Sequence, residues 1–189
     1  MSSSWGHKLR LGSLALAAVL VVGLSACSDG DEAAMEDDNG RVGQATGAAT
    51  SSVAIRDNLA QLAADTAALR QASETLISKE TVSDETRKIA QEAEPVCAKQ
   101  EAQLVKALGV DVDPSESRLD RETITRLENE EGPHADMAYL TLMEGGLEKV
   151  LGQWEELENN GGHELREFAS SSREELTDIQ KALEKRMQY

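Results

Sequence analysis

Basic residues are scarce in this chain. Its 189 residues include 19 Lys or Arg against 35 Asp or Glu, which gives a formal net charge of −16 at pH 7. Affinity for nucleic acid depends on basic side chains that neutralise phosphates, and attraction to anionic lipid depends on basic clusters. We therefore expect no nucleic-acid partner and no basic membrane-binding face. The acidity itself fits either a saline habitat or a basic protein partner.

Cysteine is nearly absent, since Cys27 and Cys97 are the only two. Cys27 belongs to an N-terminal motif described below, so Cys97 is left with the only free thiol and no bridge within the chain is expected. A single cysteine in an exported protein can pair between molecules, but more often it is a small buried apolar residue. We expect Cys97 to be buried, and an intermolecular thiol is the alternative.

The sequence also lacks the residue patterns of common catalytic and metal sites. No Ser-His-Asp or Cys-His set has an interpretable spacing, and no Gly-rich phosphate loop is present. Ferritin-like bundles bind metals through inward carboxylates and Glu-x-x-His pairs. Glu131 and His134 have that spacing, but the intervening Gly-Pro breaks the helix that the pair needs, and His163 follows a Gly-Gly turn. We expect structural or surface roles for both histidines, with metal ligation as the alternative, and we expect no cofactor and no enzymatic activity.

Residues 1–26 are typical of a secretory signal. Lys8 and Arg10 precede an uncharged, mostly apolar run at 11–26. A basic start, a short apolar segment and small residues before a cleavage site are the layout of a signal peptide. Because the run is shorter than the roughly 20 apolar residues of a membrane-spanning helix, we favour a cleaved signal over a short transmembrane anchor.

The end of this run, Leu24-Ser25-Ala26-Cys27, resembles the bacterial lipobox. The resemblance implies that a signal peptidase recognises Leu24, Ser25 and Ala26 and cuts before Cys27, and that the Cys27 thiol and the new amino group are acylated. Several acyl chains anchor a protein stably, which a single chain does not. Since Ser28 rather than Asp follows the cysteine, sorting as in enterobacteria implies a cell-envelope location at the outer membrane, facing the periplasm.

Composition and periodicity divide the chain into three segments. The signal peptide covers 1–26, the lipidated Cys27 opens a linker at 27–50, and a helical domain covers 51–189. The linker is rich in Gly, Ala and acidic residues and has no apolar period, which is typical of a flexible tether. Cleavage removes basic residues and no acidic one, so the mature chain is more negative still.

From residue 51 on, apolar residues recur at alternating steps of four and three, the spacing of one helix face. The predicted long helices cover 53–79, the segment between Ser83 and Gly109, the segment between Gly132-Pro133 and the Asn159–Gly162 turn, and 163–187. A capping box from Ser117 to Asp120 predicts a short helix at 118–129. No segment is typical of a strand. These features predict an all-α, four-helix bundle.

The predicted inward face of this bundle is almost wholly apolar. Its apolar members are Ile55, Leu59, Leu62, Leu69, Leu76, Ile89, Ala93, Cys97, Leu104, Leu108, Leu140, Met143, Leu147, Val150, Trp154, Leu157, Leu165, Phe168, Leu176, Ile179, Leu183 and Met187. Its polar members are Thr66, Ser73, Gln100 and Ser172. No carboxylate occupies an inward step, so a dinuclear metal centre lacks its ligands. Gly145 and Gly146 lie in mid-helix, where we expect close helix packing.

Five short motifs lie between residues 85 and 182. They are "ETRKIAQ" at 85–91, "LVKALGVDVDP" at 104–114, "GPHADMAYLTLM" at 132–143, "LEKVLGQW" at 147–154 and "LREFAS" at 165–170. Together they resemble a ferritin-like domain family of exported bacterial proteins, described as outer-membrane proteins of unknown function. The positions in register with that family are Gly132, Asp136, Tyr139, Met143, Glu148, Lys149, Phe168 and Ala169.

The resemblance implies a ferritin-like fold, export and an envelope location. The histidines of the family fall here on Cys97, Leu147 and Ile179, so a role that depends on them is not expected in this chain. The family has no settled activity, and the resemblance implies none. We predict a lipid-anchored envelope protein whose bundle is a non-enzymatic interaction or structural module. Its expected partners are the membrane, through Cys27, and a basic envelope protein. The alternative is a bundle that binds a metal or a small ligand.

Overall fold

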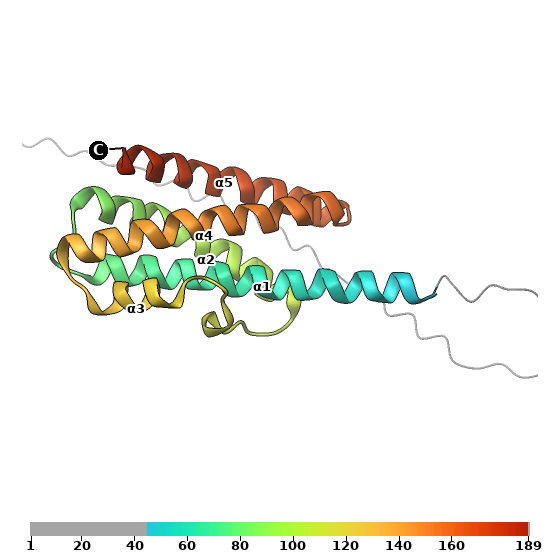
Figure 1. Cartoon of the computed structure of the whole chain (residues 1–189). Coiled ribbons are helices and arrows are strands. Elements are labelled where there is room, and N and C mark those ends of the chain that lie inside the picture. Colours follow the sequence, from blue (N-terminus) through green and yellow to red (C-terminus); the bar gives the residue numbers. More distant parts are fainter. Residues whose placement is uncertain (1–44, 189) are drawn as a thin grey trace, which may run out of the picture. The chain divides into compact units, whose positions relative to one another are not determined.

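The computed structural model describes residues 45–188 of the chain, with side chains from residue 53 on. The predicted signal peptide, the Leu24–Cys27 motif and most of the predicted linker lie outside the described residues. Over 45–188 the chain is all-helical and contains no strand, as the sequence predicts (Figure 1). The elements are α1 (Ala45–Ser78), α2 (Asp84–Leu108), the 3₁₀ helix η1 (Pro114–Glu116), α3 (Arg121–Asn129), α4 (Gly132–Asn160) and α5 (His163–Met187).

Four long helices form a bundle in which each helix packs on two others. α1 packs on α2 and α4, and α5 packs on the same two helices. α1 and α4 run antiparallel, because Lys79 just after α1 contacts Glu131 just before α4, whereas Asn58 near the middle of α1 contacts Glu156 near the end of α4. The chain thus forms two helical hairpins, α1–α2 and α4–α5. Residues 109–131, called the crossover here, join the hairpins and contain η1 and α3.

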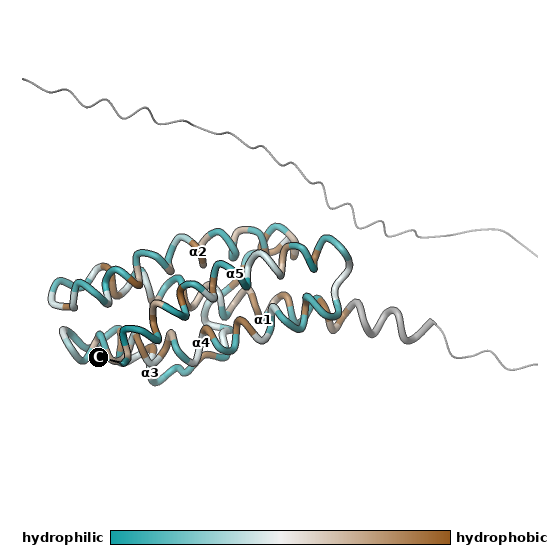
Figure 2. Tube along the Cα trace, turned by 90° about the horizontal axis from the view of Figure 1, so that it is seen from above, coloured by the Kyte–Doolittle hydropathy of each residue, from teal (hydrophilic) through white to brown (hydrophobic). Residues whose placement is uncertain are grey.

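The apolar faces of the four helices meet in a single core. In Figure 2 hydrophobic and hydrophilic residues alternate along the helices, as amphipathic helices require. The predicted inward positions between Leu62 and Leu183 are buried, apart from Leu165 and Phe168, which are partly buried like Ile55 and Leu59. Met187 is the exception at the end of α5, with 39% of its surface exposed.

Glycine allows α1 and α4 to approach closely at one point. A Cβ atom added to Gly146 would lie 2.6 Å from Cδ2 of Leu69, so a larger residue would force the buried Leu69 side chain to move. A Cβ atom added to Gly145 would meet nothing within 4 Å. The prediction of close packing is therefore confirmed for Gly146 and wrong for Gly145.

The helix ends agree with the predicted caps in α2 but not in α3. Ser83 caps α2 by accepting a hydrogen bond from the Thr86 N–H, and Gly109 ends the helix in the left-handed conformation at φ 69°. α3 begins at Arg121 rather than at residue 118, because Asp120 is its N-cap. The carboxylate of Asp120 accepts the Glu122 N–H, whereas Ser117, the predicted cap, turns toward α1.

Two other boundaries differ from the prediction. α1 begins at Ala45, within the segment that the sequence assigns to the linker, since apolar periodicity starts only near residue 53. α4 continues through Asn160, so the break before α5 is reduced to Gly161 and Gly162.

Candidate functional site

Two carboxylates are buried, although none was predicted at an inward step. Asp65 of α1 has none of its surface exposed and Asp136 of α4 has 8% exposed. Both oxygens of Asp136 lie within 3.2 Å of the Ser83 N–H, which donates to them at the start of α2. A negative charge is favourable there because the positive end of the helix dipole points at it. Asp136 therefore connects the starts of α2 and α4.

Asp65 is held by four neutral hydrogen-bond donors and by no cation. Its Oδ1 accepts the Ser117 hydroxyl and the Arg118 N–H, each at 2.8 Å, and the Gln61 side-chain amide at 3.1 Å. Its Oδ2 accepts the Gln153 amide at 3.0 Å. A buried charge is costly unless hydrogen bonds compensate it, and here they do. One carboxylate thus links α1, α4 and the crossover.

A second set of polar contacts crosses the core itself. The Trp154 indole N–H donates to Gln100 Oε1 at 3.2 Å, and the Gln100 amide donates to the Ser172 carbonyl at 3.1 Å. The Ser73 hydroxyl donates to the Leu69 carbonyl. The side chains of Ser73 and Gln100 thus have hydrogen-bond partners, as buried polar groups usually do, and Gln100 holds helices together. The hydroxyl at the predicted polar position Thr66 is buried without a partner among the described residues.

The same core contains two further ionisable groups. The Tyr139 hydroxyl lies 3.1 Å from that of Ser73, and its burial raises its pKa. Cys97 is fully buried and unpaired. Burial, with a smaller contribution from Glu101 and Glu94, raises the pKa of its thiol to about 12. A buried thiol without thiolate character is unreactive, so pairing with another molecule would first require this part of α2 to open.

The two histidines considered as metal candidates lie far apart. His134 is exposed in the first turn of α4, and His163 opens α5 beyond the end of α4. The 29 residues of α4 separate them by about 40 Å along the helix axis. His163 Nδ1 lies 3.8 Å from Glu167, with 85% of the histidine side chain exposed. Among the described residues no group of three or more His, Cys, Asp or Glu side chains could hold a metal ion.

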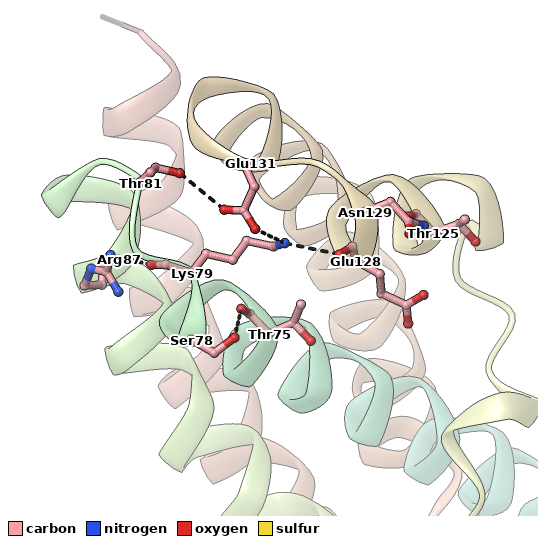
Figure 3. A network of polar contacts seen from close by, with 9 residues as sticks. All are labelled: Thr75, Ser78, Lys79, Thr81, Arg87, Thr125, Glu128, Asn129 and Glu131. Atoms are coloured by element: carbon pink, nitrogen blue, oxygen red, sulfur yellow. Dashed lines mark hydrogen bonds and ion pairs between the residues drawn. The ribbon is translucent and has the colours of Figure 1, made fainter.

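A polar network joins the turn between α1 and α2 to the start of α4 (Figure 3). The buried Lys79 ammonium donates to the Glu128 carbonyl at 3.2 Å and to Glu131 Oε1 at 3.4 Å. Thr81 donates to the other oxygen of Glu131. The Arg87 guanidinium donates to the carbonyls of Ile77 and Lys79. It thereby gives hydrogen-bond partners to carbonyl groups at the C-terminal end of α1, where the helix itself supplies no donors. This network attaches the C-terminal end of the crossover to the turn between α1 and α2.

A cavity lies between α1 and the crossover. This crossover groove has a volume of about 530 Å³. Its lining residues are Ala68, Arg70, Gln71, Ala72, Glu74, Thr75, Asp113, Pro114, Ser115, Arg121, Ile124, Leu127 and Glu128. The buried Ala68, Ala72 and Leu127 make an apolar floor, and the remaining side chains make a mainly polar rim that includes five charged residues. A concave site of this size is large enough to hold a ligand or a peptide side chain.

The charges on the two sides of the crossover groove differ in how they are paired. On α1, Arg70 lies 2.5 Å from both Glu74 and Glu101, and the hydrogen bond to Glu101 is the main cause that raises the Arg70 pKa. On the crossover, Asp113 accepts the Ser115 N–H at 2.7 Å, which lowers the pKa of that carboxyl. The Glu128 carboxylate forms no ion pair with any described residue.

Comparisons with family models, with curated proteins and with solved structures find no match to this chain. The family resemblance seen in residues 85–182 therefore stays a prediction. The three positions where that family has histidines, Cys97, Leu147 and Ile179, are all buried in the apolar core. None of the helices formed by the described residues has the length and apolar character needed to cross a bilayer.

Proposed function

We propose that the chain is a lipid-anchored protein of the bacterial envelope whose ferritin-like bundle is a non-enzymatic interaction module. The anchor rests on the Leu24-Ser25-Ala26-Cys27 motif and on the apolar run that precedes it. The stretch after Cys27 is acidic and carries no basic cluster, so lipid on Cys27, rather than charge, would hold the protein on the membrane.

The connectivity of the helices supports a ferritin-like fold. Four-helix bundles of that type have a single long crossover between two hairpins. Here α1–α2 and α4–α5 are the hairpins, and residues 109–131 are the one long connection. With this connection α2 and α4 lie diagonally across the bundle, and Gln100 and Trp154 contact each other through its centre.

The observation that carries the proposal is the buried carboxylate of Asp65. Its contacts with Ser117 and Arg118 hold the crossover beside α1, while the Lys79 network closes the other end. The crossover groove lies between these two attachments. A groove that is formed before binding costs little conformational entropy to occupy, which is what an interaction site requires.

The chemistry of the crossover groove favours a basic protein segment as the partner. Alanines on its floor leave room for apolar side chains, and its rim carries three carboxylates, of Glu74, Asp113 and Glu128, against two arginines, Arg70 and Arg121. The chain as a whole carries a formal charge of −16, which attracts positively charged partners and accelerates their association. An apolar side chain flanked by Lys or Arg would satisfy both parts of the groove.

Crosslinking within intact cells tests the groove. A photo-reactive amino acid is placed at Thr75 or Ser115 in the groove, or at Glu174 on the exposed face of α5 as a control. We expect Thr75 and Ser115 to capture the same basic envelope protein and Glu174 not to capture it. Glu128→Lys should abolish the crosslink and Glu174→Lys should leave it. Equal capture from all three positions, or capture that Glu128→Lys does not change, would contradict the proposal.

The anchor has a separate test. Cells are fed an alkyne-labelled fatty acid, and the mature protein is isolated from the envelope fraction. We expect label on an N-terminal peptide that begins at Cys27, and we expect Cys27→Ser to remain unlabelled and uncut. An unlabelled wild-type chain that still starts at residue 1 would refute lipidation without bearing on the groove.

A further inference from the structure

A second, smaller pocket lies on the other side of the crossover. It has a volume of about 230 Å³ and lies between the residues that lead into α3 and the middle of α4. Gly145 and Leu142 line it from α4, and Arg118, Asp120 and Lys149 surround it. The crossover groove and this pocket share no lining residue.

Gly145 has no structural reason to be glycine. Its φ is not positive, and a Cβ atom at this position would meet nothing within 4 Å. Glycine in a helix interior is less stable than alanine because it orders a more flexible backbone. Its neighbour Gly146 differs, since a Cβ atom there would lie 2.6 Å from the buried Leu69 side chain. Because Gly145 has no side chain, the pocket beside it stays open.

Two cations border the pocket in a chain that is otherwise strongly acidic. Lys149 Nζ donates to the Arg118 carbonyl at 2.7 Å, which uses one of its three donors. Among the described residues neither Lys149 nor Arg118 forms an ion pair with a carboxylate. The backbone of Arg118 is fixed by its hydrogen bond to Asp65. The Lys149 ammonium and the backbone of Arg118 are thus both held in place by hydrogen bonds within the fold.

One carboxylate also borders the pocket, but its oxygens are occupied. Asp120 Oδ1 accepts the Glu122 N–H and its Oδ2 accepts the Thr123 hydroxyl, and these bonds lower its pKa. It serves as the N-cap of α3, where the helix dipole offsets its charge. The two cations therefore keep unused donors toward a ligand, whereas Asp120 is already committed.

We propose that this pocket binds a small organic anion, a carboxylate or a phosphate monoester with a short apolar body. The anionic group would lie between Lys149 and Arg118, where charge-assisted hydrogen bonds are strongest. The apolar body would lie over Gly145 beside the buried Leu142. A volume of about 230 Å³ is smaller than the cavities that hold drug-sized ligands, so the ligand is short.

Saturation-transfer NMR on the full lipidated chain in detergent tests the proposal. The probes are butyrate and butyl phosphate, with butanol and butylamine as matched neutral and cationic controls. We expect saturation transfer to one or both anions and to neither control, and the stronger anion identifies the chemical class. The absence of transfer to either anion, or equal transfer to butanol, would overturn the proposal.

Variants locate the site. We expect Lys149→Met and Arg118→Met each to weaken binding by about tenfold or more, as loss of a charge-assisted bond does. Lys106 is an exposed lysine of α2 without an ion pair among the described residues, and Lys106→Met should leave binding unchanged. Gly145→Leu fills the pocket without a clash at its Cβ and should abolish binding while the melting temperature is kept. Binding that survives Gly145→Leu refutes the site even if Lys149→Met fails to fold.

Discussion

Replacement of Asp65 is the sharpest test of how the crossover is held. Asp65→Ala removes the acceptor of four hydrogen bonds. The Gln61 and Gln153 amides are only half-buried and can reach water. The Ser117 hydroxyl is buried and the Arg118 N–H is partly buried, so both lose their partner where water is scarce. We expect the loss to come mainly from these two donors.

The magnitude follows from the cost of leaving a buried donor unsatisfied, which is about 1–3 kcal/mol for each group. Removing a buried carboxylate that has no cation nearby returns part of its desolvation cost. The net loss should be about 3 kcal/mol of the free energy of unfolding, a large share of the roughly 5–15 kcal/mol of a typical domain. For a domain of this size the melting temperature should fall by roughly 6–12 °C.

Asp65→Asn is the matched control. The side-chain oxygen of the substituted residue can keep the three bonds that Oδ1 accepts, while its NH₂ group takes the place of Oδ2 beside Gln153. Gln153 Oε1 is buried and has no partner, so rotation of the Gln153 amide by half a turn would let this oxygen accept from the introduced NH₂ group. The loss should then be about 1 kcal/mol, because neutral acceptors bind more weakly than charged ones.

Thermal and urea unfolding measure both variants, and hydrogen exchange of the Arg118 amide reports the crossover directly. The exchange of this amide should accelerate strongly in Asp65→Ala and little in Asp65→Asn. The reasoning is wrong if the two variants lose equal stability, or if Asp65→Ala leaves the Arg118 amide as protected as in the wild type.

Three further perturbations test other parts of the fold. Gly146→Ala should lower the free energy of unfolding by about 1–3 kcal/mol through overpacking, whereas Gly145→Ala should raise it by up to about 1 kcal/mol; similar melting temperatures would contradict the packing described. Because the thiol pKa of Cys97 rises from 9.0 to about 12 on folding, the unfolded chain releases its proton first. Stability should therefore fall as pH rises from about 9 toward about 12, an effect that calorimetry should find reduced in Cys97→Ser, with the remainder due to Tyr139, whose pKa burial also raises. Native protein should also form no disulfide dimer on non-reducing gels. Elemental analysis after refolding with iron, zinc or copper should find no stoichiometric metal; a bound metal lost in the His134→Ala, His163→Ala double variant would favour a metal-binding bundle instead.

The helices could be predicted from the sequence because their signals are local. Steps of four and three mark the inward faces, and Ser83 and Gly109 give α2 its two ends. The start of α3 could not be placed in this way, since Ser117 and Asp120 are both good N-caps. A contact between Ser117 and Asp65, 52 positions earlier in the chain, decides between them.

The buried carboxylates were missed for a related reason. If α1 buried only one face, Asp65 would lie at the edge of that face. Every residue from Leu62 to Leu69 is buried, however, because the crossover covers a side of α1 that α2 and α4 leave open. The sequence does contain a signal of this. Residues 62–69 read LAADTAAL, and a segment with Leu or Ala at six of eight positions, on every side of the helix, is typical of a helix covered on all sides. The path of the crossover, and with it both cavities, depends on contacts that no local pattern encodes.

The single crossover determines when, during folding, the two proposed binding surfaces form. Each hairpin joins helices that are neighbours in the chain, and such local contacts form quickly, whereas contacts distant in sequence form slowly. The bond from Asp65 to the Arg118 N–H spans 53 positions and that from Asp65 to Gln153 spans 88, so the first requires the crossover to fold back on α1 and the second requires α4 to have docked on α1. The crossover groove and the Gly145 pocket should therefore be the last features to form during folding. If Cys27 carries the lipid as proposed, a chain that is still folding would already be anchored before it offered either of the two proposed binding surfaces.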